Sequence, residues 1–98
     1  MTGGIAQIWR TISERAASLP DGSYTAELIA DGTDATARKV VEEAGEVLIA
    51  AKNHQVGGDP QRVISESADL IYHLLVLLAE RGLDLSSVEQ ELDARTRN

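Results

Sequence analysis

Two short acidic patterns, each set inside an apolar stretch with helical periodicity, constrain this chain more than any other feature. The first pattern is the segment 42–46, Glu-Glu-Ala-Gly-Glu, and the second is the segment 66–69, Glu-Ser-Ala-Asp. Carboxylates three residues apart lie on one face of a helix, with Cβ atoms about 5–6 Å apart. Carboxylates are almost never buried in a core unless another group pairs with them. The two patterns therefore predict carboxylates that are gathered for a function.

The spacing of apolar residues predicts an all-α fold, specifically a four-helix bundle, because no stretch shows the sustained alternation of a strand. The first helix begins near Ile5 and ends before Pro20, and residues 24–30 are expected to form only a brief helical turn. The second helix is expected to run from an N-cap at Thr33 or Asp34 to about Gln55. Its apolar stripe consists of Val40, Ala44, Val47, Leu48 and Ala51.

The third helix is predicted to be the centre of the bundle. It begins with Asp59 as N-cap and a proline at the first helical position, and it closes at Gly82. Its second half is apolar on nearly every side, which predicts burial on all sides. A fourth helix is expected from Asp84 or Ser86, where Ser86 and Glu89 fit a capping box.

Composition narrows the class of protein. A chain of 98 residues with 43% hydrophobic residues fits one domain, residues 1–98, and a domain this small gains stability from oligomerisation. The net charge of −7 argues against nucleic-acid partners and anionic membranes. The absence of cysteine excludes disulfides and thiolate chemistry. No signal peptide or membrane span is evident, so we expect a soluble cytoplasmic protein.

The two acidic patterns are expected to face each other, because a short connection between helices makes them antiparallel neighbours. Two like charges 5 Å apart repel by roughly 3 kcal/mol at an effective dielectric near 20, so such a cluster needs a neutralising partner. Oxygen-only ligands favour Mg²⁺, or Mn²⁺ as a substitute. A di-iron centre would require Glu-x-x-His spacing, which is absent because His73 follows Asp69 by four residues. A solvated acidic helix face is the alternative for either pattern alone.

The same residues resemble the all-α nucleotide pyrophosphohydrolases of the MazG-like superfamily, through Glu-Glu-x-x-Glu at 42–46 and Glu-x-x-Asp at 66–69. Further segments resemble the phosphoribosyl-ATP pyrophosphohydrolase family. They are Pro-Asp-Gly-Ser-Tyr-Thr at 20–25, Arg-Lys-Val-Val-Glu-Glu-Ala at 38–44, and the run from Glu66 to Leu78. The resemblance covers roughly residues 5–95.

The resemblance implies Mg²⁺-dependent hydrolysis of phosphoribosyl-ATP to phosphoribosyl-AMP and pyrophosphate, the second step of histidine biosynthesis, by a helical homodimer. It also implies that this chain is the stand-alone form, without the cyclohydrolase to which the activity is fused in many organisms. By the same resemblance, the metal ligands are Glu43, Glu46, Glu66 and Asp69. Glu42 is either a further ligand or the base that takes a proton from the attacking water.

Several further residues are expected to contact the substrate, and each of them also has a purely structural explanation. Lys39 is placed to meet the triphosphate, or is a solvated lysine. The side chains of Ser23, Tyr24 and Thr25 are expected to lie over the substrate and to offer it hydroxyl groups and an aromatic face. The alternative is that these residues only stabilise a turn. Arg15, Arg38 and Lys52 are weaker candidates for phosphate contacts, and each is otherwise a plain surface charge. His73 is expected either to support the metal ligands without touching the metal or to be a core histidine.

Two other functions remain open at this point. A house-cleaning nucleoside triphosphate pyrophosphatase would share the chemistry but not the substrate, and only the Ser-Tyr-Thr segment argues against it. An acidic helical module that merely dimerises would have no catalytic function at all.

Overall fold

The computed structural model describes residues 3–96, and this part of the chain is all-α. It contains five helices: α1 (Gly4–Ser18), α2 (Tyr24–Asp31), α3 (Thr33–Gln55), α4 (Pro60–Glu80) and α5 (Leu85–Thr96). The prediction of an all-α fold is confirmed. Residues 24–31 form a complete helix rather than the brief turn that we expected, because the hydroxyl of Ser23 accepts a hydrogen bond from the backbone N–H of Ala26 and caps its first turn.

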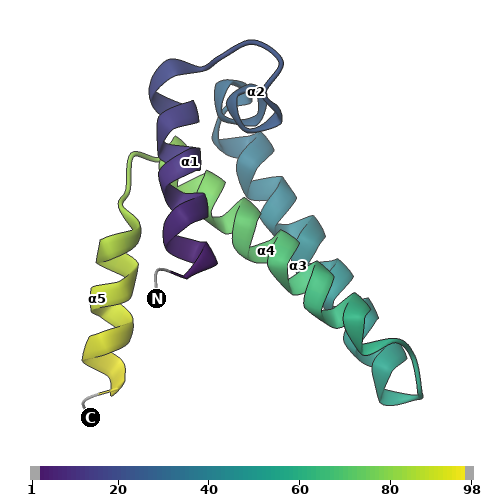
Figure 1. The fold of residues 1–98 in the computed structure, drawn as a ribbon. Coiled ribbons are helices and arrows are strands. Elements are labelled where there is room, and N and C mark those ends of the chain that lie inside the picture. Colours follow the sequence, from purple (N-terminus) through teal and green to yellow (C-terminus); the bar gives the residue numbers. More distant parts are fainter. Residues whose placement is uncertain (1–2, 97–98) are drawn as a thin grey trace.

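Helices α3 and α4 form a long antiparallel hairpin, which is the largest element of the fold (Figure 1). Gly57 has φ of +102° in the connection between them, a conformation that favours glycine. At Gly58 a Cβ atom would lie 2.7 Å from the carbonyl oxygen of Asn53, so the chain passes too close for a side chain. The carboxylate of Asp59 then accepts from the N–H of Gln61 at 2.9 Å, which confirms the predicted N-cap and fixes where α4 begins.

The buried core lies at one end of this hairpin, where α1 and α2 pack against α4. It consists of Ile12 of α1, Leu28 of α2, and Leu75 and Val76 of α4. The other end of the hairpin extends away from α1 and α2 (Figure 1). Helix α5 follows the end of α4 and buries none of its residues. Among the described residues, no helix has both the length and the apolarity needed to cross a membrane.

The predicted N-cap of α3 is wrong, and of the two predicted starts of the last helix only Asp84 is confirmed. The N-cap of α3 is Gly32, not Thr33 or Asp34, and Thr33 is already the first helical residue. Helix α5 begins at Leu85, so Ser86 lies inside it and its N–H faces the carboxylate of Asp84 at 3.4 Å. Helix α3 thus begins one residue earlier than the side-chain pattern indicated, whereas α5 begins next to Asp84, as one of the two alternatives predicted.

The apolar stripe predicted on the second helix does not lie in the core of the single chain. Ala44, Leu48 and Ala51 are exposed, and the side chain of Leu48 is 62% accessible. The expectation that α4 is buried on all sides is also wrong for the single chain, because Ile71 and Leu74 are exposed. Helices α1 and α2 cover only part of the hairpin, which leaves these side chains exposed to solvent.

Candidate functional site

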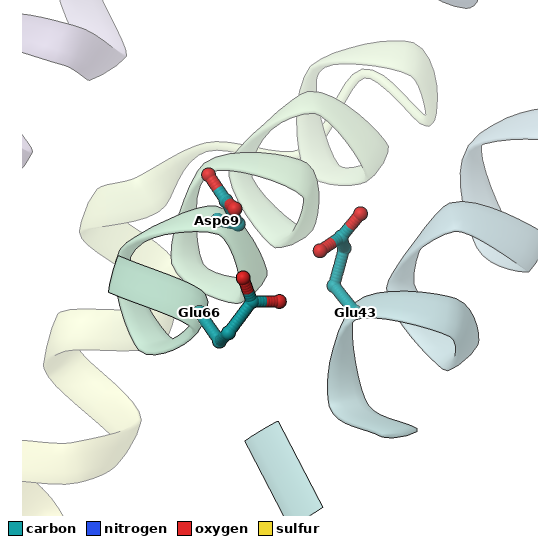
Figure 2. A group of neighbouring side chains, drawn as sticks. All are labelled: Glu43, Glu66 and Asp69. Atoms are coloured by element: carbon teal, nitrogen blue, oxygen red, sulfur yellow. The ribbon is translucent and has the colours of Figure 1, made fainter. Parts of the chain in front are cut away.

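Three of the predicted carboxylates converge between the two long helices. Glu43 of α3, Glu66 of α4 and Asp69 of α4 each offer an oxygen atom, and these atoms all lie within 4.8 Å of one another. Figure 2 shows Glu43 reaching across from one helix towards the two carboxylates on the other. The prediction that the two acidic patterns face each other is confirmed for these three residues.

The sequence produces this convergence through helix periodicity and the tight connection. Glu66 and Asp69 are three residues apart on α4 and so share one face. The hairpin makes α3 and α4 antiparallel, which brings Glu43 opposite that face. The side chain of Glu43 is only 13% accessible, while Asp69 is exposed, so the cluster opens to solvent on the side of Asp69.

Lys39 is the cation of this region. Its Nζ atom lies 3.4 Å from the carboxylate of Glu43 and 3.2 Å from that of Glu42. The hydrogen bond to Glu42 raises the pKa of Lys39 above its usual 10.5, and burial opposes this shift. In the part of the chain that the structure describes, Glu66 and Asp69 form no ion pair. Lys39 therefore pairs with one of the three clustered carboxylates, that of Glu43.

The other two predicted acidic residues lie outside the cluster. Glu42 is exposed and pairs with Lys39. Glu46 is also exposed, one turn further along α3, where it lines a pocket of about 250 Å³ together with Asp59 and Arg62 at the start of α4. The predicted ligand set is thus brought together at three positions, and Glu46 lines a different recess.

The segment 23–25 and His73 lie close together but bond mainly to each other and to the protein. The Tyr24 hydroxyl lies 2.9 Å from Nε2 of His73, and the Thr25 hydroxyl bonds to the hydroxyl of Tyr72. Ser23, Thr25 and His73 are buried, whereas Tyr24 is half exposed. Of these four predicted substrate contacts, only Tyr24 is exposed to solvent.

Two predicted phosphate contacts are directed elsewhere. A guanidinium nitrogen of Arg15 donates to the Ser23 hydroxyl at 3.4 Å, which links α1 to the start of α2. Nζ of Lys52 donates to Gln55 at 2.9 Å near the end of α3, more than two helical turns beyond Glu43. Arg38 is an exposed residue on α3.

Sequence reasoning missed the contribution of Tyr72. It anchors Thr25 of α2, and it lines an apolar cavity of about 480 Å³ that α1 and α4 form beside Asp69. The available signal was a tyrosine next to a histidine in an otherwise aliphatic run, because a buried tyrosine usually finds a partner for its hydroxyl.

The donor set fits a hard divalent cation. Three carboxylate oxygens and no sulfur are the ligands that Mg²⁺ and Mn²⁺ prefer. Ligand atoms about 2.1 Å from one Mg²⁺ ion lie about 3 to 4.2 Å apart. The oxygens of Glu43, Glu66 and Asp69 already lie within 4.8 Å, so small side-chain rotations would bring them to that spacing.

Comparison with known proteins places this geometry in a family context. The family model for phosphoribosyl-ATP pyrophosphohydrolase matches residues 5–96. The chain is 50% identical over 91 residues to the phosphoribosyl-ATP pyrophosphatase of Pelotomaculum thermopropionicum, covering 93% of this chain and 89% of that one. It is 45% identical over 97 residues to the phosphoribosyl-ATP pyrophosphatase of Metallosphaera sedula, covering 99% and 100% of the two chains.

Longer relatives contain the same segment within a larger protein. The chain is 46% identical over 93 residues to the histidine biosynthesis bifunctional protein HisIE of Bacillus subtilis, covering 95% of this chain and 43% of that one. The corresponding share of the Deinococcus radiodurans bifunctional protein is 42%. The chain therefore spans less than half the length of these bifunctional relatives, and most of the length of the shorter ones.

Proposed function

We propose, because the chain belongs to the phosphoribosyl-ATP pyrophosphohydrolase family, that it hydrolyses phosphoribosyl-ATP to phosphoribosyl-AMP and pyrophosphate in histidine biosynthesis. The observation that carries this proposal is the match over residues 5–96 combined with the convergence of Glu43, Glu66 and Asp69. The relatives of similar length are named phosphoribosyl-ATP pyrophosphatase.

A divalent cation is part of the proposal, with Mg²⁺ as the natural ion and Mn²⁺ as a substitute. Glu43, Glu66 and Asp69 would hold it, and Glu46 would reach it only after its side chain turns away from the recess that it lines. When bound, such an ion neutralises phosphate charge and lowers the pKa of a coordinated water molecule.

The protein's own residues supply the binding and the proton transfer. Hydrolysis adds water across the anhydride between the α and β phosphates, and the proton released by the water goes to a carboxylate base. Glu42 is our candidate for that base, because it is exposed on the turn beside Glu43. Lys39 lies between these two carboxylates and is the nearest cation for the polyphosphate.

We also propose that the protein is a homodimer in which a second copy covers the α3–α4 hairpin. The exposed apolar residues of α3 form a stripe at helical spacing: Val41, Ala44, Leu48 and Ala51. A second stripe on α4 consists of Ile64, Ala68 and Ile71. Large exposed apolar patches mark interaction surfaces, and a bundle of two hairpins would bury both stripes.

The remaining expectations belong to the same proposal. Residues 1–98 act as a single domain, the substrate is a small nucleotide, and the protein works in the cytoplasm without a nucleic-acid or membrane partner. The net charge of −7 is consistent with a substrate polyanion that is bound together with a cation rather than by a basic surface.

Substrate preference is the experiment that tests the proposed activity. We expect kcat/KM for phosphoribosyl-ATP to exceed that for ATP and for modified nucleoside triphosphates by at least about 100-fold, equivalent to about 2.7 kcal/mol of transition-state discrimination. A higher kcat/KM for a modified nucleoside triphosphate would assign the protein to the house-cleaning activity instead. Absence of turnover with every nucleotide would favour the non-catalytic module.

A further inference from the structure

Helix α2 is tied to α4 by two polar contacts that lie side by side in the sequence of both helices. Thr25 bonds to Tyr72, and Tyr24 bonds to His73. The first contact joins a buried threonine to a tyrosine in the body of the fold. The second joins buried His73 to a tyrosine that is half exposed. The two contacts therefore differ in what they hold in place.

The backbone of α4 selects the tautomer of His73. Its Nδ1 atom is 2.8 Å from the carbonyl oxygen of Asp69, which can only accept a hydrogen bond. Nδ1 therefore carries the hydrogen, and Nε2 of the neutral ring is left as an acceptor. The Tyr24 hydroxyl, 2.9 Å away, donates to Nε2. One imidazole thus connects the backbone of a clustered acidic residue to the tip of an exposed aromatic ring.

Tyr24 lies within electrostatic reach of the carboxylate cluster. Burial raises the pKa of Tyr24 above its usual 10.0, the charge of Lys39 lowers it, and Glu43 and Glu42 raise it further. His73 approaches Tyr24 from the hydroxyl end, with the two ring planes at 81° and the ring centroids 5.9 Å apart. This contact leaves the faces of the tyrosine ring uncovered by His73.

We propose that His73 is a positioning residue that holds Tyr24 beside the carboxylate cluster, so that the tyrosine ring forms an aromatic wall for the nucleoside part of the substrate. A solvent-exposed tyrosine without this bond would sample several rotamers, and binding would then lose free energy in ordering it. With the hydroxyl fixed, the ring is preorganised while the phosphates lie against the cluster. This inference rests on the proposed nucleotide substrate and adds a role for a buried residue that does not touch it.

The test is a double-mutant cycle in the pyrophosphate-release assay with phosphoribosyl-ATP. Tyr24→Phe keeps the ring and removes the donor, and His73→Phe removes the acceptor. Each is expected to raise KM by about 3- to 10-fold with kcat changed less than about two-fold, since one neutral hydrogen bond is lost. The double variant is expected to match the single variants, because both remove the same contact.

Tyr72→Phe is the matched control, because it breaks the parallel contact to Thr25 at the neighbouring position of α4. It should lower the thermal stability, and it should raise KM less than Tyr24→Phe does, because it leaves the bond between Tyr24 and His73 in place. Tyr24→Phe keeps the test valid if His73→Phe fails to fold, because Tyr24 is half exposed. An unchanged KM in Tyr24→Phe, or additive effects in a folded double variant, would overturn the inference while the parent remains active. A parent without turnover would contradict the proposed function, and the inference would fall with it.

Discussion

Glu43 of α3 and Asp69 of α4 place carboxylate oxygens within 4.8 Å of each other, and only Glu43 has a lysine beside it. Two carboxylates at this distance repel, and the repulsion grows as Glu66 joins them. Without a ligand this repulsion destabilises the pair of helices, whereas a bound divalent cation would attract the same carboxylates.

The three clustered carboxylates should bind the metal at a cost to stability. Asp69→Asn and Glu66→Gln are each expected to weaken Mg²⁺ or Mn²⁺ binding by at least about 10-fold in a calorimetric titration. In EDTA the same variants should melt about 2 to 6 °C higher than the parent, because a like-charge contact is relieved. Glu89→Gln on α5 is the control for loss of one negative charge. If both cluster variants bind the metal as the parent does, the three carboxylates are not its site.

Lys39 should weaken binding of the metal ion and strengthen binding of the substrate. Removing its charge with Lys39→Met is expected to tighten Mg²⁺ binding in the absence of nucleotide by about 2- to 5-fold, the range of a partly exposed ion pair. The same variant should raise KM for the nucleotide, since a cation near the polyphosphate is lost. Titration calorimetry and steady-state kinetics measure the two effects, with Arg95→Gln on α5 as the control. Weaker metal binding in Lys39→Met would contradict the competition between the two cations.

The stripe on the hairpin should control oligomeric state. Leu48→Glu combined with Ile64→Glu places charges on two residues that are 62% and 60% exposed in the single chain. We expect the parent to sediment as a dimer and the double variant to sediment as a monomer or to lose stability, because charges would have to be buried at the interface. Leu92→Glu on α5 changes an equally exposed leucine outside the stripe and should leave the dimer intact. A monomeric parent at micromolar concentration would exclude the proposed interface.

Tyr24 should ionise above pH 10.0, because burial raises its pKa while Lys39 lowers it. The chain contains two tyrosines, so Tyr72→Phe leaves a single phenol whose absorbance can be followed with pH. In that background Lys39→Met should move the midpoint higher still. A raised pKa means that the unfolded chain releases the proton first, so stability is complete below pH 10 and declines as the pH rises through the shifted value. A midpoint at or below 10.0 would place Tyr24 in a different environment.

Helix periodicity was sufficient to predict the all-α fold and the three carboxylates that meet. Glu66 and Asp69 share a face on any helix, and the Gly-Pro connection makes α3 and α4 antiparallel neighbours. The position of Glu46 was harder to predict. It is three residues from Glu43, but it lines a recess together with Asp59 and Arg62, and that recess depends on where the connection turns.

The burial pattern could not be predicted for one chain, because periodicity reports which faces are apolar and not which partner covers them. The stripe through Leu48 was interpreted as core and is exposed beside a single copy. The roles of Ser23, Thr25 and His73 could not be predicted for a similar reason. Hydroxyl and imidazole groups near a site suit either a ligand or a neighbouring helix, and the contacts with Ala26, Tyr72 and Tyr24 show what they bond to in the fold.

The most direct test of the central claim is product analysis with phosphoribosyl-ATP, carried out with and without Mg²⁺. The protein is expected to release phosphoribosyl-AMP and pyrophosphate in equal amounts, to stop when the metal is chelated, and to lose at least about 100-fold of kcat in Asp69→Asn. Folded protein that releases no pyrophosphate, or a metal-dependent parent activity that Asp69→Asn retains in full, would contradict a catalytic role for the carboxylates between α3 and α4.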